Sequence, residues 1–350
     1  MIRLKDIAEM AQVSIGTVDR VIHNRGRVSS ASKKKVMKIL EANNYRPNII
    51  AKTLSAGKTI KISALLPDPS LSAYWIKPVQ GINRAASQLS QFGAEVHTFF
   101  FDPYHASSFQ LQAERVVESD PDGILLAPIL HQEALDFSKI CRDHKIPLIC
   151  FNTYINLLNP LSFIGQDLHA SGRLAAEMMA MCQSPGTILI IHIGEKAGNS
   201  LHIHKKEEGF RELIKQQDGA PVNVVTIQLS SPATQNFEEK LDQTFKKHQD
   251  AQGIFVTTSK ANHIAHYLEK TGKTNLRLIG YDLTEENIPY LQRGTIDMLI
   301  HQNAEKQSFL GITYLVDHLV FRKAIPPMKH LPLSIITKEN LSSYLQSDLD

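Results

Sequence analysis

Residues 4–22 read LKDIAEMAQVSIGTVDRVI and predict two short helices joined by a tight turn. In the first helix, apolar residues recur every three or four positions, which places them on one face: Leu4, Ile7, Ala8 and Ala11. Gln12 and Val13 leave room only for a turn. Ser14 can cap the second helix, because its hydroxyl accepts a hydrogen bond from an otherwise unpaired N–H group. We expect this second helix to end near His23.

A third helix and a concentration of positive charge complete the N-terminal region. The helix is predicted from Ser30 or Ser32 to Ala42, with an exposed face that carries four lysines: Lys33, Lys34, Lys35 and Lys38. Residues 1–58 contain 12 Lys or Arg and 4 Asp or Glu, a net charge of +8. Because the whole chain carries only +3, the remainder is near −5. This charge distribution indicates a protein that binds a polyanion with one end.

The spacing of the three helices is typical of the helix-turn-helix DNA-binding motif. In that motif the second helix enters the major groove, and the residues at its N-terminus meet the base edges. The outward-facing residues of the second helix are therefore candidates for DNA contact: Ile15, Gly16, Thr17, Asp19 and Arg20. The alternative is an ordinary helical bundle with a solvated lysine face.

Residues 45–58 form a separate segment with the signals of a short helix. Pro47 suits a helix start, and Gly57 suits the position just past a helix end. A helix of about two turns is too short to be stable alone in water. We therefore expect this linker to become ordered only against a partner.

From residue 60 onward, short apolar runs alternate with amphipathic stretches in two successive series, 60–151 and 161–281. Continuous Ile, Val and Leu strands separated by helices indicate parallel sheets that are covered on both faces. The expected fold is thus a small all-α head followed by a two-lobed α/β body. The expected domains are the head (1–44), the linker (45–58), one lobe (59–155 and 284–325) and the other lobe (156–283 and 326–345). The chain should cross between the lobes near residues 151–160, 281–287 and 326–332.

Polar residues at the ends of the predicted strands are the candidates for ligand binding. In sheets of this kind, ligands bind beyond the carboxyl ends of the strands. The candidates are Asp68, Asn152, Gln166, Asp167, Thr258, Ser259, Asp282 and Gln302. Tyr74 and Trp75 follow the first strand and could pack on the apolar face of a sugar. Each of these residues could equally cap a helix or close a turn.

Several stretches resemble the LacI/GalR family of transcriptional regulators, whose body is similar to the type I periplasmic sugar-binding fold. They are VSIGTVDRVI (13–22), NNYRPN (43–48), AKTL (51–54), IGYD (279–282), LIHQ (299–302) and ITKEN (336–340). The resemblance implies these DNA-contacting positions: Ser14, Ile15, Gly16, Thr17, Arg20, Tyr45, Asn48, Ala51 and Leu54. It also implies that Leu54 wedges between base steps in the minor groove.

The same resemblance implies effector contacts from Asn152, Lys206, Asp282 and Gln302, with Asp167 and Ser259 beside them. Lys206 stands where the family commonly has arginine. The lysine ammonium group is a point charge, whereas the arginine guanidinium group is a planar fork. The effector can therefore be a phosphorylated or carboxylated sugar as well as a neutral one. Asp19 stands where the family usually has serine, and its role is open.

The expected function is a DNA-binding transcriptional regulator, a repressor of carbohydrate-related genes, controlled by a sugar or sugar derivative bound between the lobes. Its expected partners are operator DNA and a second copy of the chain, as a homodimer or within a tetramer. The alternative is a sugar-binding solute receptor that does not act on DNA. The sequence contains no GxGxxG after a strand, P-loop, HExxH or GxSxG, so we expect neither enzyme activity nor a cofactor.

The remaining signals indicate a cytoplasmic protein. No apolar run is long enough to span a bilayer, and the N-terminus has no signal-peptide pattern. Cys141, Cys150 and Cys182 lie in apolar segments, so we expect buried free thiols. His202 and His204 lack a third ligand at suitable spacing, and we expect no metal site.

Overall fold

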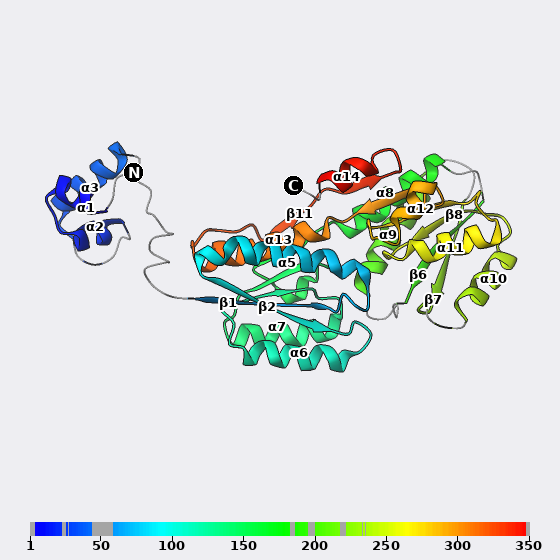
Figure 1. Cartoon of the computed structure of the whole chain (residues 1–350), viewed down its shortest axis with the longest axis horizontal. Coiled ribbons are helices and arrows are strands. Elements are labelled where there is room, and N and C mark those ends of the chain that lie inside the picture. Colours follow the sequence, from blue (N-terminus) through cyan, green and yellow to red (C-terminus); the bar gives the residue numbers. More distant parts are fainter. Residues whose placement is uncertain are drawn as a thin grey trace. The chain divides into compact units, whose positions relative to one another are not determined.

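The computed structural model describes residues 4–22, 26, 28–43, 59–182, 186–194, 200–217, 222–232, 234 and 236–347. It divides into two compact units, Met1–Lys58 and Thr59–Asp350, which we call the head and the body (Figure 1). The predicted linker at residues 45–58, with Tyr45, Asn48, Ala51 and Leu54, lies outside the described residues.

The head is built from three short helices around a small apolar core. They are α1 (Leu4–Ala11), α2 (Ile15–Ile22) and α3 (Ser30–Ala42). The core comprises Ile7, Ala8, Ala11, Val18, Val21 and Val36. The Ser14 hydroxyl accepts a hydrogen bond from the Thr17 N–H at 3.2 Å, so the predicted cap is confirmed. The turn between α1 and α2 places Gln12 at a φ of 55°.

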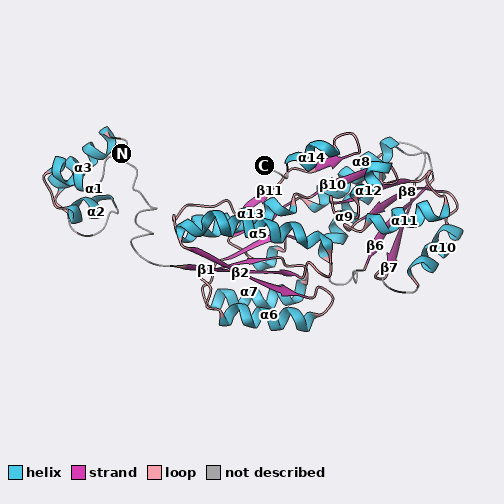
Figure 2. Ribbon diagram, viewed as in Figure 1, coloured by secondary structure: helices cyan, strands magenta, loops and turns pink. Residues whose placement is uncertain are grey.

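The body contains two six-stranded sheets, one in each lobe (Figure 2). The first sheet is parallel throughout, in the order β11-β5-β4-β3-β1-β2. Its strands are β1 (Ile60–Pro67), β2 (Ala94–Phe101), β3 (Gly123–Leu126), β4 (Leu148–Asn152), β5 (Ser162–Gly165) and β11 (Met328–His330). Its α-helices are α5 (Ile76–Leu89), α6 (Ala106–Glu118), α7 (His131–Asp143) and α13 (Ala304–Leu319), with 3-10 turns at η1 (Ala73–Trp75), η2 (Ser90–Phe92) and η3 (Asn156–Leu158).

The second sheet has the order β12-β10-β9-β8-β6-β7 and is parallel except for β12, which runs antiparallel to β10 at the edge. Its strands are β6 (Thr187–Ile193), β7 (Asn223–Leu229), β8 (Ala251–Val256), β9 (Arg277–Tyr281), β10 (Met298–His301) and β12 (Ser334–Ile336). Its helices are α8 (Leu168–Cys182), α9 (Leu201–Gln216), α10 (Phe237–Lys247), α11 (Ala261–Thr271), α12 (Ile288–Arg293) and α14 (Leu341–Ser347).

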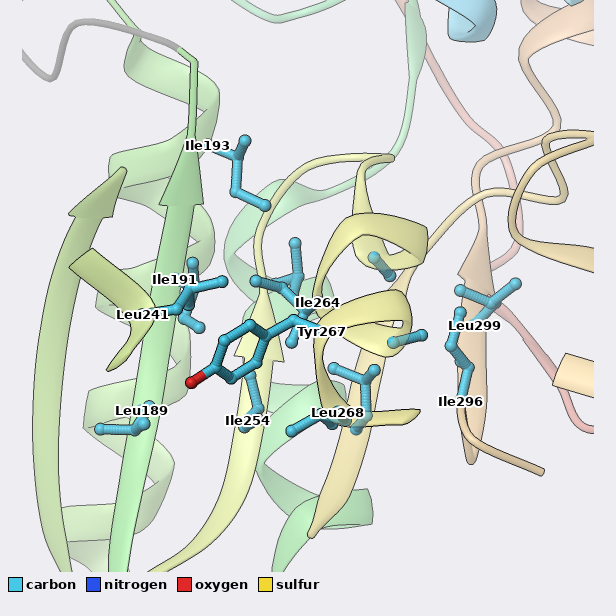
Figure 3. Close-up of a cluster of buried hydrophobic side chains, with 14 of the residues drawn as sticks. Leu189, Ile191, Ile193, Leu241, Ile254, Ile264, Tyr267, Leu268, Ile296 and Leu299 are labelled. Carbon is cyan, nitrogen blue, oxygen red and sulfur yellow. The ribbon is translucent and has the colours of Figure 1, made fainter. Parts of the chain in front are cut away.

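Helices cover both faces of each sheet, which explains the continuous apolar strands. In β1, Ile62 and Leu66 pack under α5 and α13, whereas Leu65 faces α6 and α7 on the other side. In β6, Ile188 and Ile190 face α8 and α9. The opposite face of this sheet packs against α10, α11 and α12, where Leu189, Ile191, Leu241, Ile264 and Leu268 form the cluster in Figure 3.

The predicted lobe boundaries were wrong at three places. β5 joins the first sheet beside β4, although residues 156–283 were expected in the second lobe. β10 joins the second sheet, although residues 284–325 were expected in the first lobe. β11 lies in the first sheet and not in the second. An apolar run shows that a strand is buried, but not which neighbour it pairs with. The first two crossings were therefore predicted one strand too early, and the third was predicted to begin before β11 although it follows this strand.

The three actual crossings are tied together by one side chain. Gln166 follows β5, His301 ends β10, and Pro332 lies between β11 and β12. The Gln166 Nε2 group donates hydrogen bonds to the His301 carbonyl at 2.9 Å and to the Pro332 carbonyl at 2.8 Å. Gln166 is 3% exposed. This amide therefore joins the three connections between the lobes.

Cys141 and Cys150 are buried free thiols, as predicted, and the Cys182 side chain lies outside the described residues. Burial raises the pKa of Cys141 to about 12 and raises that of Cys150 as well. None of the helices in the described ranges combines the length and apolarity needed to cross a bilayer.

Candidate functional site

A cavity of about 260 Å³ lies between the two lobes of the body, at the carboxyl ends of the strands. Its first-lobe wall consists of Ser72, Tyr74, Trp75, Pro103, Tyr104, Ala106, Ile129, Leu130 and Asn152. Its second-lobe wall consists of Leu168, Gly194, Ser200, His202, Lys206, Thr257, Thr258, Ser259 and Lys260, and Gln302 lines it from the crossing after β10. Both lobes therefore supply polar and apolar side chains to one cavity.

The first-lobe wall is an aromatic pair with an amide beside it. Trp75 packs edge-on against Tyr74, with ring centroids 4.9 Å apart, and against Phe151 at 6.2 Å. The Asn152 amide donates a hydrogen bond of 2.6 Å to the Tyr74 hydroxyl. Burial and the nearby Asp282 carboxylate raise the pKa of Tyr74 well above its usual value, although the bond from Asn152 opposes them. Tyr74 thus keeps its proton at neutral pH and can donate it.

Asn152 itself is held in an unusual backbone conformation. Its φ is +71°, a left-handed value that asparagine tolerates better than most residues. Its N–H donates to the Gln307 side-chain oxygen at 3.0 Å, and the Gln307 amide donates to the Gln302 carbonyl at 2.8 Å. A side chain of α13 therefore links the end of β4 to the end of β10.

Asp282 lies just behind the second-lobe wall and organises two of its residues. Asp282 Oδ2 accepts hydrogen bonds from the Ser259 hydroxyl at 2.6 Å and from the Gln302 amide at 2.7 Å. Asp282 is 5% exposed and has a φ of +66°. The Asn287 amide fixes this turn by donating to the carbonyls of Ser259, Tyr281 and Asp282 at 3.0 Å each. The carboxylate therefore positions Ser259 and Gln302 and is not itself part of the cavity wall.

Lys206 projects from α9 and is 2% exposed. Its Nζ lies 3.6 Å from the centroid of the Tyr281 ring and donates to the Thr257 carbonyl at 3.0 Å. A cation this close to an aromatic face is stabilised by the ring quadrupole. The helix bearing Lys206 lies unusually close to α8, since a Cβ on Gly172 would come within 1.9 Å of the Lys206 carbonyl oxygen. Glycine at position 172 thus permits the packing that positions this lysine.

A polar network lies behind Thr257 and Lys206. The Thr257 hydroxyl is 2.7 Å from His192 Nδ1, and His192 Nε2 is 2.7 Å from a Glu207 carboxylate oxygen. Burial alone would raise the pKa of Glu207, but hydrogen bonds from His192, Thr226 and Arg211 lower it to about 2. Glu207 is therefore ionised across the physiological range and holds one face of α9 against β6 and β7.

One contact joins the two lobes across the cavity. Lys260, at the start of α11, donates from Nζ to the Tyr104 hydroxyl at 3.2 Å and to the Ile193 carbonyl at 3.3 Å. Tyr104 follows β2 in the first lobe. This hydrogen bond is made only when the lobes approach each other.

The structure brings seven of the eleven predicted ligand residues to the cavity wall: Tyr74, Trp75, Asn152, Lys206, Thr258, Ser259 and Gln302. Asp282 is one shell behind them. Asp68 and Asp167 are not brought to the wall. Asp68 Oδ1 accepts from the Ser70 N–H at 2.8 Å, and Asp167 Oδ1 accepts from the Ala170 N–H at 2.9 Å at the start of α8. Both side chains turn back onto nearby backbone groups.

Tyr104 and Lys260, which bond to each other across the cavity, were not among the predicted ligand positions. Tyr104 follows β2 and Lys260 follows β8, so extending the strand-end search by three or four residues would have found them. Thr258 is 7% exposed, and its hydroxyl has no hydrogen-bond partner among the described residues. No group of three His, Cys, Asp or Glu side chains in the described ranges could hold a metal ion.

In the head, five of the predicted DNA-contacting residues lie in α2 or directly before it. Ser14, Ile15, Gly16 and Arg20 are exposed, and Thr17 is half-buried against the Ser14 cap. Ile15 is 49% exposed, which is unusual for a large apolar residue that serves only the core. The other four predicted positions, Tyr45, Asn48, Ala51 and Leu54, lie outside the described residues.

Comparison with known proteins agrees with this division into head and body. Residues 3–48 match the model for bacterial regulatory proteins of the lacI family, and residues 63–323 match the periplasmic binding protein domain. A protein of known structure from Bacteroides fragilis, described as a candidate LacI transcriptional regulator, is 31% identical. It superimposes with a TM-score of 0.78 over 82% of this chain and 100% of its own. The chain belongs to the LacI family of bacterial regulatory proteins.

Other relatives of this LacI-family protein include repressors of sugar operons. The ribose operon repressor of Halalkalibacterium halodurans is 26% identical over 290 residues, 81% of this chain and 80% of that protein. The sucrose operon repressor of Pediococcus pentosaceus is 26% identical over 287 residues, 81% of this chain and 82% of that protein. An Agrobacterium vitis solute-binding protein, solved with α-D-tagatopyranose, shares the body fold with a TM-score of 0.73 at 20% identity, over 83% of this chain and 98% of its own.

Membership of the LacI family gives the two units their roles. The helix-turn-helix head is a DNA-binding module, and the protein is a DNA-binding transcriptional regulator. The body has the two-lobed fold of the periplasmic binding proteins.

Proposed function

We propose that this LacI-family regulator represses carbohydrate-related genes, and that a small polar effector, a sugar or sugar derivative, controls its binding to operator DNA. The observation that carries the proposal is the interlobe cavity, which an aromatic pair and polar side chains line together. Aromatic rings pack on the apolar face of a sugar, while amides and hydroxyls bind its hydroxyl groups. The names of the curated relatives, repressors of ribose and sucrose operons, support the same reading.

In the head, we propose that α2 reads the major groove of the operator. Arg20 is suited to donate two hydrogen bonds to a guanine, and Ile15 and Gly16 lie close enough to the helix start to approach base edges. Ser14 caps the helix by accepting from the Thr17 N–H, and both hydroxyls would lie near the phosphate backbone. Two such heads in a homodimer would bind the two halves of a pseudo-palindromic site. We also propose that the regulator acts in the cytoplasm, on chromosomal DNA.

We further propose that Asn48, Ala51 and Leu54 contact the minor groove from the linker, and that Tyr45 lies near the phosphates. A linker helix of about two turns is marginal, so a small change in the separation of the two copies would decide whether it forms. Leu54 would then insert between base steps at the centre of the operator.

Effector binding would act through the angle between the lobes. A ligand that contacts Tyr74, Trp75 and Asn152 on one lobe and Ser259 on the other stabilises the arrangement in which both walls are close. The equilibrium between the open and closed states then shifts by the difference between the free energies with which the ligand binds these two states. The connections joined by Gln166 are where the body would bend.

A mobility-shift assay with genomic fragments and a salt titration tests the DNA-binding part. The parent should select specific fragments, and Arg20→Ala should weaken those complexes by roughly tenfold to a hundredfold through loss of a base contact. Leu54→Ala should also weaken them. Lys38→Ala, on the exposed face of α3, should reduce specific and non-specific binding alike. Fragments bound without selection, with Arg20→Ala and Leu54→Ala equal to the parent, would favour a solute receptor instead.

A further inference from the structure

The described wall of the cavity carries two lysines, Lys206 and Lys260. Among the described residues that line the cavity, none is aspartate or glutamate. A low-dielectric enclosure strengthens the field of such charges, and an anion is the ligand that gains from it.

The ammonium group of Lys206 is held in place before any ligand arrives. The Tyr281 ring and the Thr257 carbonyl fix its direction, and the close approach of Gly172 fixes the backbone from which it extends. A buried charge that is already oriented loses little entropy when it binds a ligand.

The two lysines add hydrogen-bond donors to the described wall, because an ammonium group only donates. Tyr74 retains a proton to donate, because burial first and Asp282 second raise its pKa. Donors of this kind suit a ligand that carries an oxyanion, which only accepts hydrogen bonds.

The cavity volume limits the size of the ligand. At about 260 Å³ it lies below the roughly 300–1,000 Å³ of pockets that hold drug-sized molecules. A ligand of monosaccharide size fits this volume better than a disaccharide. Trp75, paired edge-on with Tyr74, provides the flat surface for its ring.

We propose that the cavity binds a monosaccharide derivative that carries an oxyanion, a phosphate or a carboxylate, with Lys206 contacting the anion. This rests on the proposed function, in which the cavity is the effector site. Thr258, whose buried hydroxyl has no partner among the described residues, is a second contact for the same ligand. Lys260 supplies a second positive charge, and its bond to Tyr104 joins the anion-binding lobe to the other lobe.

Calorimetric titration of the full-length protein tests this ligand class with matched pairs of probes. The pairs are glucose with glucose 6-phosphate and with glucuronate, and ribose with ribose 5-phosphate, with inorganic phosphate as the bare anion. At least one anionic sugar should bind about tenfold or more tightly than its neutral counterpart, because a hydrogen bond to a charged group contributes that much. Its affinity should exceed that of inorganic phosphate and should fall as salt rises.

Lys206→Met removes the charge and keeps an unbranched side chain of similar length, and it should abolish the preference for the anionic member. Lys205→Met is the matched control, because Lys205 is the adjacent residue but is exposed and paired with Glu208 at 2.7 Å. It should leave the preference unchanged. Lys260→Met, at a less buried position, should reduce the preference even if Lys206→Met fails to fold.

Three results would overturn the anionic ligand. They are equal or tighter binding of every neutral sugar, failure of every anionic sugar to bind, or a preference that persists in both Lys206→Met and Lys260→Met. Operator binding in the same preparations separates this from the proposed function. If a neutral sugar binds and alters the operator complex, the ligand is not an anionic sugar, but control of DNA binding by an effector still holds. If the parent protein shows no specific operator binding, either with or without ligand, the proposed function itself is wrong.

Discussion

The contact between α8 and α9 can be perturbed by replacing Gly172 with alanine. The new Cβ would lie 1.9 Å from the Lys206 carbonyl oxygen, whereas ordinary van der Waals contacts begin at 3.4 Å. The oxygen belongs to helix backbone and cannot rotate away, so α9 would have to move by roughly 1.5 Å. Overpacking of this kind costs about 1–3 kcal/mol, and alanine regains at most about 1 kcal/mol of helix propensity. We expect a net loss of about 2 kcal/mol in the free energy of unfolding of the body.

Urea unfolding followed by fluorescence measures this loss. Trp75 is the single tryptophan of the chain and is 5% exposed in the body, so its emission reports unfolding of the body and not of the head. Glu177→Ala, at an exposed position of α8, is the matched control and should change the free energy by less than about 0.5 kcal/mol. A Gly172→Ala variant as stable as the parent would refute the packing argument, as would unchanged ligand affinity despite a displaced α9.

Three further variants test other parts of the structure. Gln166→Leu removes the donor for the His301 and Pro332 carbonyls and should lower the free energy of unfolding by about 1–3 kcal/mol in the same urea assay. Glu207→Gln should make the free energy of unfolding less dependent on pH in acid. The parent carboxylate stabilises the fold fully above pH 4.5, and this contribution is lost as pH falls toward the lowered pKa of about 2. Ser14→Ala should destabilise the head by about 1 kcal/mol, measured by amide hydrogen exchange, because the Thr17 N–H loses its acceptor.

Each of these expectations has a result that contradicts it. Gln91→Leu, at an exposed glutamine, should be neutral, and an equal loss in both glutamine variants would mean that the crossings do not depend on Gln166. A Glu207→Gln variant with the parent's full decline between pH 4.5 and 2 would assign the acid sensitivity to other carboxylates. If Ser14→Ala accelerates amide exchange, relative to the parent, more in the body than in the head, the capping role of Ser14 is not local.

The head was predictable because its signals are local. The spacing of Ile7, Ala8 and Ala11 determines a helix face, and Ser14 acts within its own turn. The alternation of strands and helices in the body was predictable for the same reason. The sheet to which β5 belongs was not, since SFIG is equally apolar beside β4 or in the other lobe. Strand pairing depends on contacts far apart in the sequence, and the periodicity of a single run carries no information about them.

The candidate site was partly predictable from the rule that ligands bind beyond strand ends. Asn152, Ser259 and Gln302 follow that rule and line the cavity. Asp68 and Asp167 also follow strands, but short-range bonds to backbone N–H groups turn them away. Tyr104 and Lys260 meet only because the two lobes approach each other. Such an encounter depends on lobe geometry, which no local pattern encodes.

The central claim is that occupancy of the interlobe cavity controls DNA binding by the head. The most direct test is fluorescence anisotropy of a labelled operator duplex, selected from genomic fragments and titrated with full-length protein with and without a saturating cavity ligand. The account predicts that the apparent Kd for the operator differs by at least about fivefold between the two titrations, the lower end of measured allosteric coupling. A ligand that demonstrably fills the cavity, yet leaves the operator Kd unchanged, would contradict it.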